Sequence, residues 1–117
     1  MKRFVLLLCT LSFALTAYAA ESSVDAGLPE ISDLGRLNGQ VLACGYTDTA
    51  AQIKDVMIRL APKSRRYGAA FEEATNEGFL AQSRKERNTC MDGPTFNSLV
   101  EEISRRLQAA LPVAAAK

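Results

Sequence analysis

The residues of this chain that could do chemistry are a few cysteines and some clusters of carboxylate and basic side chains. Histidine is absent from all 117 residues, so neither a Ser-His-Asp nor a Cys-His centre can be built. There is also no Gly-rich phosphate loop, no zinc-binding spacing and no nucleophile elbow. Proton transfer would depend on Glu, Asp, Lys or Tyr alone. We therefore expect no catalytic residue, no metal site and no cofactor, and a protein that is not an enzyme.

Three carboxylates, Glu72, Glu73 and Glu77, lie close together in the sequence. Consecutive residues such as Glu72 and Glu73 do not face each other on a helix, and no Asp-x-Asp calcium loop accompanies them. We interpret these carboxylates as one solvated helix face.

A basic cluster, Lys63, Arg65 and Arg66 followed by Tyr67, stands near the start of an expected helix. Cations at that end oppose the helix dipole, so the cluster is a candidate surface for an anionic partner: a carboxylate-rich protein surface, a phosphate or a lipid head group. Ordinary solvated surface is the alternative. A second basic stretch, residues 83–87, falls at a helix end, where the dipole explains it.

The beginning of the chain has the pattern of a secretory signal peptide. Lys2 and Arg3 form a charged start, residues 4–17 carry no charge, and residues 17–19 are Ala-Tyr-Ala. A charged start, an apolar run and a small-residue exit are typical of a cleaved signal, and this run is shorter than the roughly 20 residues that span a membrane. We predict removal of residues 1–19 and export to the periplasm of a Gram-negative bacterium, or secretion.

The exported chain would keep 98 of the 117 residues, with 12 of the 14 basic side chains against 13 acidic ones. Such a nearly neutral chain has no general electrostatic attraction to nucleic acid or anionic lipid. It also has no second long apolar stretch. We expect a protein partner, no nucleic acid and no membrane after signal removal, with the oligomeric state left open.

Cleavage of the signal peptide would remove Cys9 and leave two cysteines, Cys44 and Cys90. An even number of cysteines in an oxidising compartment predicts a disulfide, which here would close a loop of about 46 residues and contribute about 4 kcal/mol. A redox-active thiol is disfavoured, because there is no Cys-x-x-Cys spacing and no neighbouring His.

Apolar residues recur at helical spacing along the rest of the chain, without a strand-like alternation or an internal repeat. Gly27 and Pro29 interrupt residues 20–31, which we predict to be a flexible lead-in. A first helix then begins after a cap at Ser32 or Asp33. Gly45 either separates it from the second helix or bends one long helix. Gly39 lies where a second helix could approach closely.

The second and third helices have their own boundary signals. Residues 47–49, Thr-Asp-Thr, supply capping oxygens for the second, which Pro62 ends, and Ser64 caps the third. Asp55 and Arg59 are spaced to pair within a helix. The third helix has its apolar stripe at Tyr67, Ala70, Phe71, Ala74, Gly78 and Ala81, with Phe79 and Leu80 widening the buried face.

The last helix has the clearest pattern. Pro94 suits its first turn, Pro112 stops it, and residues 113–117 should fray. Its apolar stripe is Phe96, Leu99, Val100, Ile103, Leu107 and Leu111, with Glu101–Arg105 and Glu102–Arg106 as pairs on the outer face. We predict an all-α domain over residues 32–112, a small bundle of three to four helices stapled by one disulfide.

Residues 37–45, 61–68 and 71–72 resemble segments of uncharacterised small helical periplasmic proteins of proteobacteria, a likeness that supplies no activity. In outline, with Cys44 and Cys90 as the matching residues, the chain is also similar to HdeA-type acid chaperones and to immunity proteins of type VI secreted amidases. These resemblances imply a small exported helical protein with one disulfide.

Three functional hypotheses remain. The first is a non-enzymatic periplasmic protein that acts by binding another protein, as an inhibitor or immunity protein does. The second is an acid-stress chaperone, because protonating its carboxylates below about pH 4 would leave the chain strongly cationic. The third is a minor structural or accessory protein.

Overall fold

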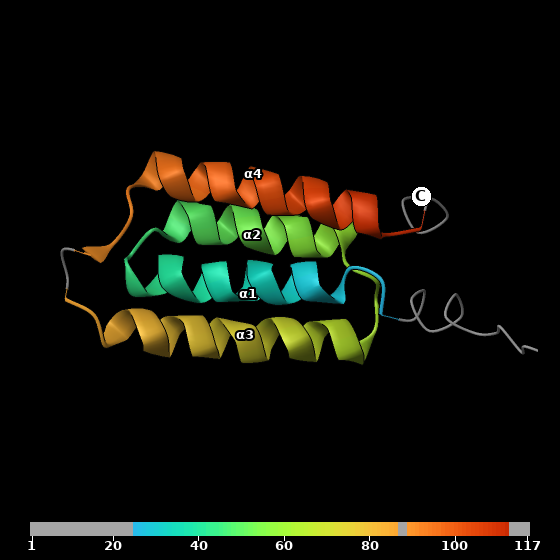
Figure 1. The fold of residues 1–117 in the computed structure, drawn as a ribbon, viewed down its shortest axis with the longest axis horizontal. Coiled ribbons are helices and arrows are strands. Elements are labelled where there is room, and N and C mark those ends of the chain that lie inside the picture. Colours follow the sequence, from blue (N-terminus) through green and yellow to red (C-terminus); the bar gives the residue numbers. More distant parts are fainter. Residues whose placement is uncertain (1–24, 87–88, 113–117) are drawn as a thin grey trace, which may run out of the picture.

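The computed structural model describes residues 25–86 and 89–112, which form four helices (Figure 1). These are α1 (Leu28–Ala43), α2 (Thr47–Leu60), α3 (Arg65–Ser83) and α4 (Gly93–Ala110). α1 and α3 run in one direction, and α2 and α4 run in the other (Figure 1). The described residues contain no strand. The predicted all-α bundle is therefore confirmed, whereas the signal segment and residues 113–117 lie outside the described residues.

One apolar core is shared by α1, α2 and α4, which pack against one another in pairs. α3 packs mainly against α1 and contributes a single buried member, Tyr67, to this core. The Tyr67 hydroxyl donates a 2.8 Å hydrogen bond to the carbonyl of Ala26, so its polar end is satisfied. The side chains that are fully buried in the core are Ile31, Leu34, Val41, Ile53, Phe96 and Leu107.

Glycines bring the backbones of α1 and α3 into contact. A Cβ added to Gly39 would overlap backbone atoms of Thr75 and Phe79, and one added to Gly78 would overlap the carbonyl of Arg36. Asn38, also on α1, donates a 3.2 Å hydrogen bond to the Thr75 hydroxyl. The expectation that Gly39 permits close approach of a second helix is confirmed.

The turn between α1 and α2 shows whether Gly45 separates two helices or bends one long helix. Gly45 has φ +82°, a left-handed conformation that ends α1 and lets the chain reverse. Two separate helices result. Residues 47–49 do not cap α2 as expected, because α2 begins at Thr47 and no side chain accepts a hydrogen bond at that end. Ser64 does precede α3, although its side chain also makes no capping bond.

α1 begins earlier than the sequence pattern indicated. The predicted start at Ser32 or Asp33 was wrong, because the helix begins at Leu28 and includes the last four residues of the expected lead-in. Pro29 lies in the first helical turn, where its missing N–H leaves no hydrogen bond unmade. The added turn buries Ile31 completely.

Two predictions about side-chain placement on α3 were also wrong. Phe79 and Leu80 do not widen the buried face, since they are 42% and 44% exposed. Ala81 is exposed as well, and Gln82 is buried in its place. The cause is that α3 packs mainly against one helix, α1, so only a narrow stripe of its side chains is buried.

Ion pairs follow the tertiary structure more than the helix spacing. Arg59 and Asp55 pair at 2.8 Å as expected. The expected pairs Glu101–Arg105 and Glu102–Arg106 do not form in the described part of α4. Arg106 lies 3.4 Å from Asp33 of α1 instead, because the packing of α4 on α1 brings this carboxylate within its reach.

The α1–α3 contact makes a sharp prediction for two Gly→Ala variants. Gly39→Ala should lower the free energy of unfolding by about 1–3 kcal/mol, because the new methyl group forces the two backbones apart. Gly68→Ala should raise it by about 0.5–1 kcal/mol, since a Cβ there meets nothing within 4 Å and alanine favours the helix. Urea denaturation measures both. Equal effects of the two substitutions would contradict the close contact.

Candidate functional site

The predicted disulfide is present and closes one end of the bundle. Cys44 directly follows α1, Cys90 lies in the segment before α4, and their Cα atoms are 5.9 Å apart. Gln82, in the last turn of α3, donates to the Thr89 hydroxyl at 3.4 Å and contacts the Cys90 sulfur at 3.6 Å. The bond therefore ties the segment between α3 and α4 to the end of α1.

The basic cluster at the start of α3 is only partly available to a partner. Tyr67 is 6% exposed and belongs to the core, so its selection as a surface residue was wrong. Arg66 pairs with Asp25 at 2.8 Å, and the Lys63 ammonium donates to the carbonyl of Ile58. Arg65 is exposed and takes part in none of the ion pairs among the described residues.

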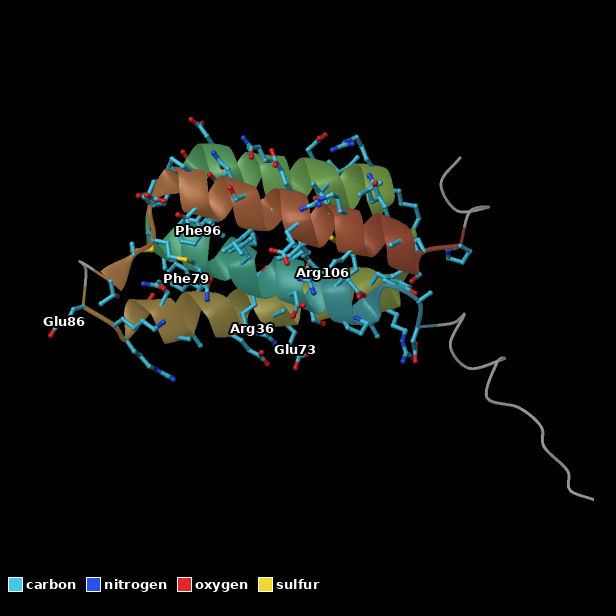
Figure 2. The ribbon with its side chains drawn as sticks, turned by 45° about the horizontal axis from the view of Figure 1, so that its top comes forward. Arg36, Glu73, Phe79, Glu86, Phe96 and Arg106 are labelled. Carbon is cyan, nitrogen blue, oxygen red and sulfur yellow. A yellow bond between two sulfur atoms is a disulfide. The ribbon has the colours of Figure 1, made fainter. Side chains whose placement is uncertain are left out.

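A hollow of about 400 Å³ lies between α1 and α3. We call it the apolar hollow, because Leu42, Phe71 and Phe79 line it. Leu42 and Phe79 are 41% and 42% exposed, although both are large hydrophobic residues. Phe79 lies toward the end of the bundle that carries the disulfide (Figure 2). The polar residues of the lining are Asn38, Glu72, Thr75 and Asn76.

A second hollow of about 370 Å³ lies where α2 ends and α3 begins. We call it the basic hollow, because Lys54, Lys63 and Arg65 surround it. Its apolar surface includes Ile58, which is 59% exposed. The other residues of its lining are Met57, Ala61, Pro62, Ser64 and Gly68.

Sequence patterns identified only part of these two hollows. Lys63 and Arg65 were candidates, whereas Lys54 stands nine residues before Lys63, on α2, and Lys63 lies in the segment between α2 and α3, so no local pattern links the two. Phe79 was assigned to a helix face expected to be buried. An exposed apolar residue cannot be recognised from helical spacing until the neighbours of its helix are known.

Carboxylates take part in surface ion pairs. Glu72, Glu73 and Glu77 are exposed, as expected for a solvated helix face, and Glu77 lies 3.9 Å from Arg36. Arg36 and Arg106, labelled in Figure 2, both bind Asp33, at 3.3 and 3.4 Å. Within residues 25–86 and 89–112, no group of three or more Cys, Asp or Glu side chains is placed to hold a metal ion.

Asp92 caps α4. Its carboxylate accepts a 2.9 Å hydrogen bond from the backbone N–H of Thr95. Hydrogen bonds from the Thr95 side chain and backbone favour the charged form and lower the pKa of Asp92 below its usual 3.8. The cap fixes the start of the helix that follows Cys90.

Comparison of the chain with protein-family models, with curated proteins and with solved structures found no match. None of the described helices is both long enough and apolar enough to cross a membrane.

Loss of the disulfide should weaken the fold strongly. The Cys44→Ser/Cys90→Ser variant should lose about 4 kcal/mol of unfolding free energy, because the unfolded chain regains the entropy of a 46-residue loop. Urea denaturation of this variant, and of the wild type with and without dithiothreitol, measures the loss. Identical midpoints for oxidised and reduced wild type would contradict it.

The Asp92 cap predicts an acid-dependent contribution to stability. Since the pKa of Asp92 is lower in the folded state, its contribution is present above pH 3.8 and is lost as the pH falls through the folded value. Asp92→Asn keeps an acceptor but removes the charge, so its melting temperature should fall less between pH 6 and about pH 2 than that of the wild type. A carboxyl NMR titration that places Asp92 at or above 3.8 would contradict this.

Proposed function

We propose that this protein works in the periplasm, or outside the cell, by binding another protein and not by catalysing a reaction. The disulfide supports an oxidising compartment. The proposal depends chiefly on one observation: Leu42 and Phe79, each about two-fifths exposed, flank a hollow between two helices.

Exposed apolar side chains around a hollow are typical of surfaces that bind proteins. An aromatic ring at such a site buries a large area when a partner covers it, and few rotatable bonds have to be fixed. Glu72, Thr75 and Asn76 supply polar groups around the apolar residues. This combination of an apolar centre and a polar rim is the usual anatomy of a protein interface.

Rigidity supports the same proposal. The apolar hollow is built on α1 and α3, whose backbones touch through Gly39 and Gly78. A surface held in this way is available while the protein is folded, so binding does not require acid to loosen the chain. We therefore favour an inhibitor- or immunity-like role over that of an acid-stress chaperone.

Phe79 and Leu80 provide a matched pair of variants. They are adjacent on α3 and equally exposed, but Phe79 lines the apolar hollow and Leu80 does not. Phe79→Asp should reduce binding at least tenfold, because the partner would have to bury a charge. Leu80→Asp should leave binding within about twofold of the wild type.

The measurement uses the oxidised protein, immobilised and exposed to periplasmic extract of the source cells. Mass spectrometry identifies and quantifies the retained proteins, and circular dichroism verifies that both variants are folded. Failure of the wild type to retain any protein would refute the proposed function. So would a partner that Phe79→Asp retains as well as Leu80→Asp does.

A further inference from the structure

We propose that the two hollows belong to one groove along α3, and that this groove takes a segment of the partner protein in which apolar residues are followed by acidic ones. This inference rests on the proposed function and adds the chemistry of the partner. The basic hollow, which the proposed function leaves without a role, is its starting point.

Both hollows open on the same flank of α3. Arg65 and Gly68 line the basic hollow, and Glu72, Thr75 and Phe79 line the apolar hollow. These five residues are spaced alternately by three and four positions, which places them in one row along a helix. From Arg65 to Phe79 the row is about 21 Å long at 1.5 Å per residue.

In each hollow, the wall that faces α3 comes from a different helix. Leu42 of α1 faces the apolar hollow, and Ile58 of α2 faces the basic hollow. Both side chains are more than two-fifths exposed. Each hollow therefore has an exposed apolar side chain on the wall that faces α3, and an extended or helical segment of a partner that lies along the row could contact both.

The basic end carries charge that the protein itself does not neutralise. Lys54, Lys63 and Arg65 form no ion pair with any described carboxylate, although four other arginines of the bundle do. No Asp or Glu lines the basic hollow, and Glu72 is the one carboxylate in the lining of the apolar hollow. Three cations beside exposed Ile58 favour acidic side chains on a partially apolar segment.

Peptides selected from a random library test this inference, because the selection does not depend on which protein is the partner. The oxidised protein is used to select from phage-displayed peptides of about sixteen residues, which span about 24 Å when helical. Selected peptides should carry two or more apolar residues on one side of an acidic cluster. Their binding should weaken as the salt concentration rises.

Two charge-reversal variants measure the contribution of the basic hollow. Lys54→Glu/Lys63→Glu/Arg65→Glu should bind the selected peptides roughly tenfold more weakly, as expected from three exposed ion pairs. The control variant Arg84→Glu/Lys85→Glu/Arg105→Glu changes the net charge equally, at positions outside both hollows. It should bind them within about twofold of the wild type.

Peptides that depend on Phe79 but bind both triple variants equally would overturn this inference and leave the proposed function standing. Selection that enriches no peptide would overturn this inference alone, because retention of proteins from periplasmic extract tests the proposed function separately. Self-association of the chain that Phe79→Asp abolishes would show that a second copy occupies the groove. Lys54-dependent binding to vesicles of anionic phospholipid, in place of peptides, would show that the basic hollow binds a membrane.

Discussion

At Gly39 and Gly78 the backbones of α1 and α3 meet so closely that no side chain fits between them. The position of α3 depends on this contact, because α3 places only Tyr67 in the core shared by the other helices. Hydrogen bonds from Asn38 to Thr75 and from Tyr67 to Ala26 reinforce the contact. The Cys44–Cys90 disulfide ties the segment that follows α3 to the end of α1. A helix with few buried apolar residues is thus fixed by backbone proximity and one covalent bond.

This way of attaching α3 explains why large hydrophobic residues stay exposed. A helix surrounded by neighbours buries a broad stripe, but α3 has one principal neighbour and buries a narrow one. Phe79 falls outside that stripe, at the side of the α1–α3 contact, and Leu42 lies opposite it. The apolar hollow is therefore a consequence of the architecture. The proposed binding function uses a surface that the fold leaves uncovered.

Much of the architecture could be predicted from the sequence. The periodicity of α4 identified Phe96, Val100, Ile103 and Leu107 as buried residues, and the cysteine count predicted the disulfide. Sequence patterns within one helix could not predict features that depend on contacts between helices. Nothing within the α3 sequence shows that one neighbour covers it, so Phe79 was assigned to the core. For the same reason, Lys54 could not be placed beside Lys63 and Arg65 before α2 and α3 were positioned.

Nuclear Overhauser effects on the labelled, oxidised protein measure how close α1 and α3 lie to each other. We expect cross-peaks between the α-protons of Gly39 and protons of Thr75 and Phe79, since a Cβ added to Gly39 would overlap backbone atoms of both. Absence of the Gly39 cross-peaks, with the Phe79 ring packed among core residues, would show that the backbones of α1 and α3 are not in contact.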